Sequence, residues 1–442
     1  MKRAWSCWWA VALLAVGCAP EPKPVSVSSP QGRDAPAAKS GAPAVKSDLP
    51  SPEPCSWPRF HGPKGDNLST ETGLLRQWPK DGPRLLWTAK GLGPGYASVA
   101  IAGGTIYTTG NHKDQSTVFA LDMAGKILWQ SPCGAGWTGS YPGMKATPTV
   151  EDDRLYIETP HGIVSCLNAK TGRPIWSVDI LKEFEGKNLQ WALAESILLD
   201  GPRAICCPGG NKGSVVALDK MTGKTVWAAK STGDNAGYAT PTLVEYQGLR
   251  IILNMTAKAL IGVNADDGDL LFRHPHETSY DVNATTPLFY DGQVFITSGY
   301  GSGGEMLRIK VDGKKASLEK LWDAKQLDNH HGGVILLDGC IYGCSYGPKW
   351  ICLDWQTGKV LYAERGVGKG SLTYADGMLY TLSEKRAMGL VEANPKAHKV
   401  VSQFKLPPGG EGESWAHPVV CGARLYLRHG DALFCYQVKA DK

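Results

Sequence analysis

Short apolar stretches separated by turn-forming residues recur along the chain at intervals of roughly 40 to 50 residues. In each interval an apolar strand leads into Asp or Asn, a turn that contains Gly, and a second strand that ends in an aromatic residue. Copies of this phrase are LDMAGKILW, LNAKTGRPIW, LDKMTGKTVW, VNADDGDLLF and LDWQTGKVLY, which end at Trp129, Trp176, Trp227, Phe272 and Tyr362. Because Asp and Asn side chains cap such turns and Gly adopts the left-handed conformation, each copy predicts two paired antiparallel strands.

A second phrase lies upstream of each turn phrase. It consists of small residues, often Pro, followed by an apolar strand, a turn and another apolar strand. Examples are ATPTVEDDRLYIET from Ala146, TTPLFYDGQVFITS from Thr285 and AHPVVCGARLYLRH from Ala416. Together the two phrases predict four short antiparallel strands per repeat, which is one blade of a β-propeller.

The number of upstream phrases predicts eight blades. They begin near Tyr96, Ala146, Ala194, Ala239, Thr285, Gly332, Ser371 and Ala416, whereas only seven closing aromatic residues follow Tyr96 when degraded copies at Trp322 and Phe404 are included. The eighth is Trp87, on an N-terminal strand that has no blade of its own. We therefore expect an all-β fold, an eight-bladed propeller of four-stranded antiparallel blades. The N-terminal strand should complete the last blade, beside three strands between Trp415 and Val438, and so remove the exposed sheet edges.

The N-terminal region has the composition of an export signal. Lys2 and Arg3 precede an apolar run at residues 10–16, and Gly17-Cys18 follows, which predicts a lipoprotein signal peptide over 1–17 with lipidation of Cys18. An ordinary signal or a short membrane anchor is the alternative. Residues 18–54, rich in Pro, Ser and Ala, predict a disordered tether before a propeller at 55–438. Ala19 resembles the outer-membrane sorting pattern, so a lipoprotein anchored in the outer membrane and facing the periplasm is expected.

Net charge and cysteine usage narrow the function classes. The formal charge of +5 falls to +3 when Lys2 and Arg3 leave with the signal, which argues against a nucleic-acid partner. Ten of the twelve cysteines remain once Cys7 is removed with the signal and Cys18 is set aside for lipid. Their spacing matches neither a small disulfide framework nor paired C-x-x-C metal motifs. Cys344 and Cys352 flank an expected hairpin and are candidates for a cross-strand disulfide, whereas most other cysteines are expected to be buried free thiols.

These repeats resemble the pyrroloquinoline-quinone (PQQ) repeat propellers over nearly all of residues 55–438. The segments WPRFHGPKGDN, NHHGG at Asn329, SWAHPVV and ALFCYQV look like a secreted, planctomycete-type branch that is often labelled polyvinyl-alcohol dehydrogenase. The wider family includes PQQ-dependent alcohol dehydrogenases and a cofactor-free outer-membrane assembly lipoprotein. The resemblance therefore implies the fold but does not choose between an oxidoreductase and a protein without enzymatic activity.

The residues before each innermost strand should converge at the mouth of the central channel. This set consists of Tyr96, Lys145, Trp191 with Glu195, Tyr238, Asn283, His330 with His331, Lys369, and Trp415 with His417. A PQQ-dependent dehydrogenase would need an aromatic platform, a Ca²⁺ held by oxygen ligands and a carboxylate base. The resemblance implies Glu195 and Asn283 as metal ligands, Asp281 or Asp328 as the base, and Trp191 or Trp415 as the platform. Cys206-Cys207 is a candidate for a vicinal disulfide over the quinone, although the pair follows Glu195 in the chain, whereas the family pattern places it before.

The histidines near the mouth offer a second chemistry. His330 or His331, together with His417 and Glu195, has the imidazole and carboxylate groups that transition metals accept. Adjacent residues of a strand face opposite ways, so only one of His330 and His331 is expected to point into the channel. The structural alternative is that these histidines, Glu195 and Asn283 serve only in hydrogen bonds.

Two functions follow from the sequence. The first is an exported, lipid-anchored propeller that binds an envelope protein or a small-molecule ligand at the channel face without chemistry. The second is a periplasmic dehydrogenase, dependent on PQQ and Ca²⁺, that oxidises alcohol or sugar hydroxyls. The sequence has no C-x-x-C-H haem motif, so such an enzyme would need an external electron acceptor.

Overall fold

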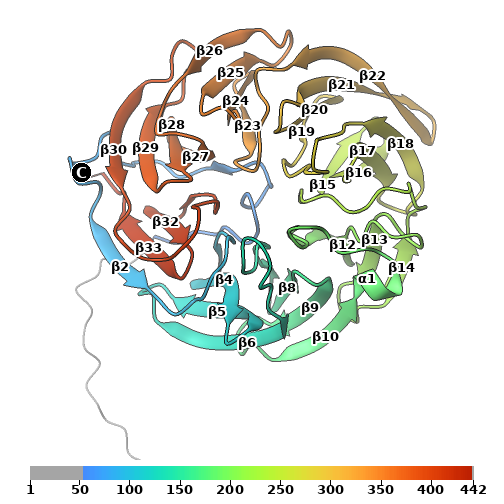
Figure 1. The fold of residues 1–442 in the computed structure, drawn as a ribbon, viewed down its shortest axis with the longest axis horizontal. Coiled ribbons are helices and arrows are strands. Elements are labelled where there is room, and N and C mark those ends of the chain that lie inside the picture. The colour runs from blue at the N-terminus through green and yellow to red at the C-terminus, as the bar shows by residue number, and fades with distance from the viewer. Residues whose placement is uncertain (1–52, 441–442) are drawn as a thin grey trace, which may run out of the picture. The chain divides into compact units, whose positions relative to one another are not determined.

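The computed structural model describes residues 53–440, which form one ring of eight sheets around a central axis (Figure 1). Seven sheets have four strands, and the eighth gains a fifth from a short parallel strand. A single turn of helix, α1 (Ile180–Glu183), occurs in the described part of the chain. The predicted all-β, eight-bladed propeller is therefore confirmed. The predicted signal peptide, Cys18 and tether residues up to 52 lie outside the described residues.

The first four blades follow one another in chain order. Blade 1 contains β3 (Ala100–Ala102), β4 (Thr105–His112), β5 (Gln115–Asp122) and β6 (Ile127–Ala135). Blade 2 contains β7 (Thr149–Glu151), β8 (Arg154–Glu158), β9 (Ile163–Asn168) and β10 (Pro174–Asp179). Blade 3 contains β11 (Leu198–Asp200), β12 (Arg203–Cys206), β13 (Val216–Asp219) and β14 (Thr225–Ala228). Blade 4 contains β15 (Thr242–Tyr246), β16 (Leu249–Met255), β17 (Ala259–Asn264) and β18 (Leu270–Pro275).

The last four blades complete the ring. Blade 5 contains β19 (Leu288–Tyr290), β20 (Gln293–Ser298), β21 (Gly303–Asp312) and β22 (Lys315–Ala324). Blade 6 contains β23 (Val334–Leu337), β24 (Cys340–Cys344), β25 (Trp350–Asp354) and β26 (Val360–Glu364). Blade 7 contains β27 (Gly370–Ala375), β28 (Met378–Ser383), β29 (Ala387–Glu392) and β30 (Val400–Lys405), with β1 (Leu68–Ser69) parallel to β27. Blade 8 contains β31 (Val419–Val420), β32 (Arg424–His429), β33 (Ala432–Gln437) and β2 (Leu85–Ala89).

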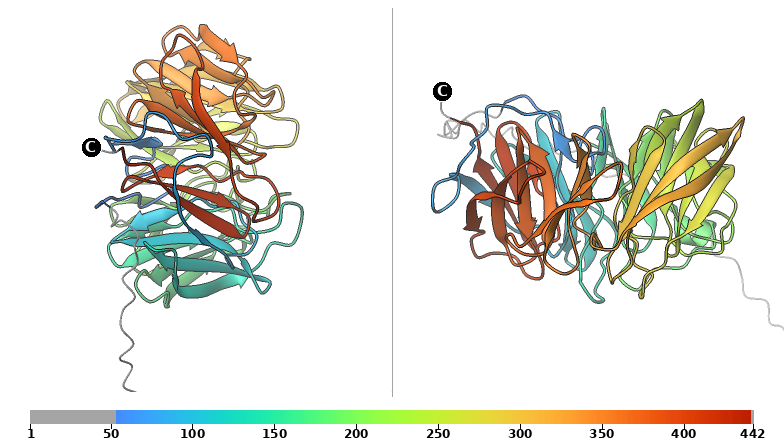
Figure 2. Two further views of the ribbon diagram at one scale, coloured as in Figure 1. Left: turned by 90° about the vertical axis from the view of Figure 1, so that its left-hand side faces the viewer. Right: turned by 90° about the horizontal axis from the view of Figure 1, so that it is seen from above.

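The ring is closed by the N-terminal strand, as the sequence predicts. Strand β2 pairs antiparallel with β33, with Trp87 opposite Cys435. It forms the outermost strand of a blade whose other three strands come from the C-terminal end of the chain, as the blue and red segments of Figure 1 show. Seen from the side, the strands of each blade run between the two faces of the ring, and the connecting loops gather on those faces (Figure 2). In the described residues no helix is long and apolar enough to cross a membrane.

Neighbouring blades are joined by a tryptophan that packs on a glycine. Trp227, on the outermost strand of blade 3, covers Gly268 in the last turn of blade 4, and its Nε1 donates a hydrogen bond to the carbonyl of Ala265 at 3.2 Å. The same arrangement joins Trp87 to Gly125, Trp129 to Gly172, Trp176 to Gly223 and Trp322 to Gly358. A Cβ atom on any of these glycines would lie 2.5 to 2.8 Å from the indole ring. The predicted turn glycines are thus required both by backbone conformation and by the packing between blades.

The N-terminal segment from Trp57 to Ser69 crosses the axis and closes one end of the channel. It pairs with blade 1 through Trp57 and Ile101, and it accepts a hydrogen bond from blade 2 at the carbonyl of Pro58, 2.8 Å from the Val150 nitrogen. At its other end β1 lies beside β27 in blade 7. We call residues 57–69 the plug, because they turn the channel into a cup that opens on one face only.

The cysteines differ in part from the prediction. Cys55 and Cys421 form a disulfide, which the sequence did not suggest, and it ties the start of the plug to blade 8. The expected Cys344–Cys352 pair is wrong, because Cys344 lies opposite Trp350 and Cys352 lies opposite Tyr342 in the same hairpin. Cys206 and Cys207 are buried free thiols, so no vicinal disulfide is present.

The packing between blades predicts different effects for two glycines of blade 4. Gly268 and Gly248 have φ values of 84° and 82°, but a Cβ on Gly268 would lie 2.7 Å from Trp227, whereas Gly248 has open space. Gly248→Ala should lower the free energy of unfolding by about 1 kcal/mol, because alanine is strained in the left-handed conformation but meets no neighbouring atom. Gly268→Ala should cost a further amount of about 1 to 3 kcal/mol from the clash with the indole. Guanidinium unfolding of both variants measures the difference, and equal stabilities would contradict the docking role.

Candidate functional site

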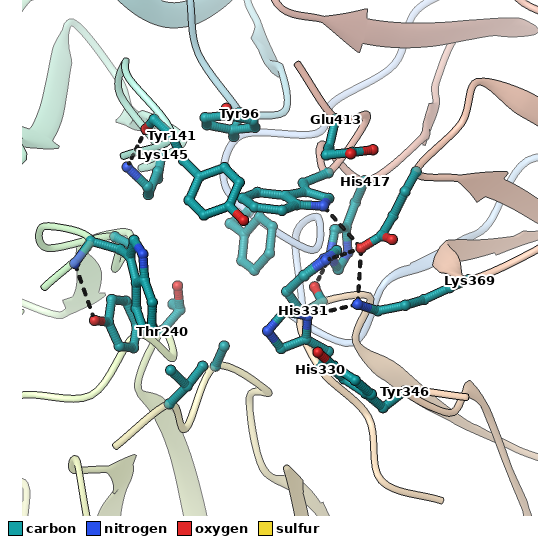
Figure 3. Close-up of a pocket in the computed structure, with 18 of the residues that line it drawn as sticks. Tyr96, Tyr141, Lys145, Thr240, His330, His331, Tyr346, Lys369, Glu413 and His417 are labelled. Atoms are coloured by element: carbon teal, nitrogen blue, oxygen red, sulfur yellow. Dashed lines mark hydrogen bonds and ion pairs between the residues drawn. The ribbon is translucent and has the colours of Figure 1, made fainter. Parts of the chain in front are cut away.

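A cavity of about 320 Å³ lies on the axis, where the innermost strands begin. Phe60 of the plug belongs to its lining, and the opposite side is open. The other lining residues come from every blade: Tyr96, Tyr141, Lys145, Trp191, Ala194, Ser196, Tyr238, Thr240, Val282, Ala284, Tyr300, His330, His331, Tyr346, Lys369, Glu384, Glu413, Trp415 and His417. We call this cavity the cup (Figure 3).

The residues that precede the innermost strands line the cup, because the start of each of these strands lies nearest the axis. Trp191, Trp415, His330, His331 and His417, all cofactor-binding candidates from the sequence, are among them. The expectation that only one of His330 and His331 faces the channel is wrong, because both lie in the loop before β23, where strand alternation does not apply. The same geometry accounts for the loop residues Tyr96, Lys145, Tyr238 and Lys369, which the sequence also brings to the channel mouth.

Glu384 is the centre of a hydrogen-bond network in the cup. Its Oε1 accepts from His331 Nε2 at 2.8 Å, from Lys369 Nζ at 3.0 Å and from Trp415 Nε1 at 3.0 Å (Figure 3). Burial disfavours the charged carboxylate, but the hydrogen bond from His331 and the charge of Lys369 outweigh it and lower the pKa of Glu384 to about 2. Glu384 is therefore ionised at neutral pH, and its charge is compensated inside the cup.

The histidines of the cup are neutral. Burial, together with the neighbouring His331 and Lys369, lowers the pKa of His330 to about 2. Burial also lowers the pKa of His331, and it lowers that of His417 to about 4. Each imidazole is held by hydrogen bonds: His330 Nδ1 lies 2.9 Å from Lys369 Nζ, and its Nε2 lies 3.0 Å from the hydroxyl of Tyr300. These rings act as fixed hydrogen-bonding groups at physiological pH.

His330, His331 and Glu384 have the donor set of a metal site, since their ligand atoms lie within 4.8 Å of one another. The Lys369 ammonium contacts both His330 Nδ1 and Glu384 Oε1, so a positive charge already occupies the position between two of the three donors. A divalent cation would have to displace it against charge repulsion. The arrangement therefore fits a lysine salt bridge better than a metal ion.

His417 takes part in a different contact. Its Nδ1 lies 3.0 Å from Nε2 of His61 in the plug, and its Nε2 lies 2.9 Å from the carbonyl of His331. Both ring nitrogens thus connect the plug and blade 6 to blade 8. The metal set of His417 with Glu195 that the sequence suggests stays a prediction, and the two side chains have separate hydrogen-bond partners.

Glu195 and Asn283, the Ca²⁺ ligands that the resemblance implies, are buried and are not among the residues that line the cup. Glu195 accepts a hydrogen bond of 2.6 Å from the backbone nitrogen of Cys207, and burial raises its pKa. Its neighbour Glu158 is also fully enclosed, and burial together with the charge of Glu195 raises the pKa of Glu158 further. Glu158 ends β8 of blade 2, and both of its carboxylate oxygens are buried without a hydrogen-bond partner among the described residues.

Asn283 serves as a bridge between loops. Its Nδ2 donates to the carbonyls of Thr256 and His276, both at 2.9 Å, and its Oδ1 accepts from the Ser298 hydroxyl at 2.5 Å. Because its amide donors and its carbonyl oxygen are all hydrogen-bonded within the described residues, the Asn283 side chain holds these loops together.

The base candidates Asp281 and Asp328 lie in loops near the mouth and are also outside the lining. Asp328 accepts from the backbone nitrogen of Tyr346 at 3.1 Å and from that of Gly301 at 3.2 Å. Asp281 occupies a turn with φ of 57°. Asp328 thereby fixes the loops that present Tyr300 and Tyr346 to the cup.

Several lining residues were missed by the sequence reasoning. Tyr300, Tyr346 and Glu384 follow the second strand of their blades: Glu384 comes directly after β28, and Tyr300 and Tyr346 come two residues after β20 and β24. In a hairpin the end of the second strand lies beside the start of the first, as Ser383 lies opposite Gly370. A polar or aromatic residue within two positions of the end of each second strand is therefore the signal that could have identified them.

The family model described as outer membrane protein assembly factor BamB matches residues 61–179 and 114–364 of the chain. The BamB protein of Kangiella koreensis is 25% identical over 208 residues, which cover 46% of this chain and 48% of that protein. The BamB protein of Bordetella pertussis is 24% identical over 303 residues, 66% of this chain and 69% of that protein. The match thus spans about half the length of the first relative.

Solved structures show the same fold. BamB from Moraxella catarrhalis aligns with a TM-score of 0.56 and 14% identity, over 81% of this chain and 98% of that one. A quinohemoprotein alcohol dehydrogenase from Comamonas testosteroni aligns with a TM-score of 0.63 and 11% identity, over 88% and 81%. The fold is therefore shared with proteins described as an assembly factor and as a dehydrogenase.

The depressed pKa of Glu384 predicts an acid-dependent loss of stability. A carboxylate with a pKa near 2 in the folded protein stabilises it above the unfolded pKa of about 4.3, and this contribution is lost as the pH falls toward 2. With allowance for partial exposure, Glu384→Gln should cost about 2 kcal/mol at pH 7 and should flatten the stability profile between about pH 4.3 and 2.

Glu413→Gln is the matched control for this prediction. Glu413 also lines the cup, but no hydrogen bond or ion pair of its carboxylate occurs in the described part of the chain. Its substitution should leave the unfolding free energy, measured by denaturant titration at each pH, within about 0.5 kcal/mol of the wild type. If the two variants gave the same profile, the central role of Glu384 would be wrong.

Proposed function

We propose that this chain, which belongs to the family described as outer membrane protein assembly factor BamB, is a binding protein of the cell envelope. It holds a ligand in its cup and does not catalyse a reaction of that ligand. The observation that carries the proposal is the closed network around Glu384. Its carboxylate accepts three hydrogen bonds, including one from the Lys369 ammonium, and the cup histidines are neutral. A carboxylate with a pKa near 2 is a poor general base at neutral pH.

The donor set of the cup argues against a PQQ-dependent dehydrogenase. Ca²⁺ takes six to eight oxygen ligands, many of them carboxylates. The lining contains only two carboxylates, Glu384 and Glu413, and the first is engaged by Lys369. The implied ligands Glu195 and Asn283 have hydrogen-bond partners of their own outside this lining. The residues present therefore do not fit a calcium-bound quinone, and we assign no catalytic step to them.

The envelope location is part of the same proposal. A signal peptide over residues 1–17, lipidation of Cys18 and a tether over 18–54 would attach the propeller to the outer membrane and leave it in the periplasm. The relatives are described as outer membrane protein assembly factors, which supports an envelope protein as a second partner. The loops that surround the cup form the face on which we expect such a partner to bind.

An oxidation assay tests whether the protein has PQQ-dependent dehydrogenase activity. Purified full-length protein, supplied with PQQ and Ca²⁺, should not reduce an artificial electron acceptor with a series of primary alcohols and sugars. The reason is that Glu384 is engaged by Lys369 and Glu413 alone cannot supply the six to eight oxygen ligands that Ca²⁺ takes. Glu195→Gln serves as the comparison and should behave like the wild type. Calcium-dependent turnover that is lost in Glu195→Gln would establish the dehydrogenase instead.

A fractionation experiment tests the anchor. If Cys18 carries lipid, the wild-type protein should sediment with the membrane fraction, and Cys18→Ser should shift it to the soluble fraction. Cys7→Ser is the matched control, since Cys7 precedes the predicted cleavage site and its replacement should leave the distribution unchanged. Membrane association that persists in Cys18→Ser would contradict lipidation at this residue.

A further inference from the structure

Aromatic rings follow one another almost completely around the mouth of the cup. Successive ring centroids lie 4.6 to 6.4 Å apart from Trp191 in blade 3, through blades 5 and 6, to Trp415 in blade 8. Trp415 then contacts Tyr96 at 4.9 Å and Tyr141 at 4.6 Å. We call this set the collar; its members are Trp191, Tyr280, Tyr300, His330, His331, Trp415, Tyr96 and Tyr141. Seven of the eight line the cup, whereas Tyr280 lies outside the lining and connects Trp191 with Tyr300, so a ligand in the cup meets ring faces and edges on most sides.

The charges inside the collar balance. The lining contains two ammonium groups, Lys145 and Lys369, and two carboxylates, Glu384 and Glu413, while its histidines are neutral. A polyanion would meet both carboxylates, and an organic cation would meet both lysines. Because like charges in an enclosed site repel strongly, the cup favours a ligand without net charge.

The cup also has polar groups that are not used within the protein. In the described residues the Glu413 carboxylate and the Tyr96 hydroxyl have no hydrogen-bond partner. Lys145 Nζ donates only to the carbonyls of Tyr141 and Gly143, at 3.2 and 3.4 Å. Burial raises the pKa of Tyr96 to about 12 and lowers that of Lys145 to about 8. At neutral pH the cup therefore offers the Tyr96 hydroxyl, the Lys145 ammonium, which lies 5.7 Å from the centre of the Tyr96 ring, and the Glu413 carboxylate as an acceptor.

We propose that the ligand of the cup is a neutral saccharide of one or two rings. A pyranose presents C–H groups on its faces, which pack against the negative faces of aromatic rings, and hydroxyls at its edge, which are both donors and acceptors. The collar supplies the ring faces, and Lys145, Glu413 and Tyr96 supply partners for the hydroxyls. A purely apolar ligand would bury these three groups without compensation. The volume of about 320 Å³ is at the lower end of ligand sites, which suits a small sugar.

This inference rests on the proposed binding function, and it names the class of ligand. Isothermal titration calorimetry of the full-length protein with glucose, N-acetylglucosamine, maltose, cellobiose and chitobiose tests it directly. We expect saturable binding of at least one of these sugars. No saturable binding to any of the five would overturn the saccharide assignment.

Two cup variants and one control connect the binding to the collar. Trp191→Ala removes a stacking surface and should weaken sugar binding at least about tenfold. Tyr96→Phe keeps the ring but removes the hydroxyl, and it should weaken binding by about 3- to 10-fold. Tyr290→Ala replaces a tyrosine that is 60% exposed on β19 and is not a lining residue, so its affinity should match the wild type. Sugar affinity that is unchanged in both cup variants would place the site elsewhere and contradict the proposal.

The outcomes of this titration and of the oxidation assay separate the two proposals. Sugar binding without oxidation supports both. Sugar binding with calcium-dependent oxidation would support the saccharide as the ligand, but it would contradict the proposal that the protein binds its ligand without catalysing a reaction. No binding and no oxidation would reject the saccharide alone.

Discussion

The contact between a tryptophan on one blade and a turn glycine on the next is the interaction on which the ring depends. Each blade is a small twisted sheet that is stable only when its faces are covered by its neighbours. The indole of Trp227 fills the space left by the missing side chain of Gly268, and its Nε1 donates to a carbonyl of the same turn. Repetition of this contact at five of the blade interfaces sets the spacing of the blades, and hence the point on the axis where their innermost strands begin.

The plug closes one end of the channel at the point where the innermost strands begin. The axis of a propeller is a channel, but residues 57–69 pair with blades 1 and 7 and contact His417 of blade 8 through His61. The Cys55–Cys421 disulfide closes a loop of 366 residues, and cross-links over long loops remove the most chain entropy from the unfolded state. Ring closure by β2 and channel closure by the plug therefore both use the N-terminal segment.

Sequence reasoning identified the repeats, the number of blades and the closing strand, because these depend on local turn chemistry and on period. It also brought Trp415, His330 and Lys369 to the axis, since the starts of the innermost strands must converge there. It missed Glu384 and Tyr300, because their place in the cup comes from hairpin pairing between the first two strands. It missed the Cys55–Cys421 disulfide as well, since this bond joins residues 366 positions apart and no local pattern marks it.

The positions of the acidic groups determine which carboxyls a ligand in the cup can meet. Glu158 and Glu195 lie behind the wall, where burial raises their pKa values, and Glu384 lies in the cup beside a lysine that lowers its pKa to about 2. The raised pKa values therefore belong to carboxyls outside the cup lining, and Glu384, the engaged carboxylate inside it, is a poor general base at neutral pH. A carboxylate fixed by three donors instead holds Trp415, His331 and Lys369 in place. The network thus keeps part of the collar in one conformation before a ligand arrives, which reduces the entropy lost on binding.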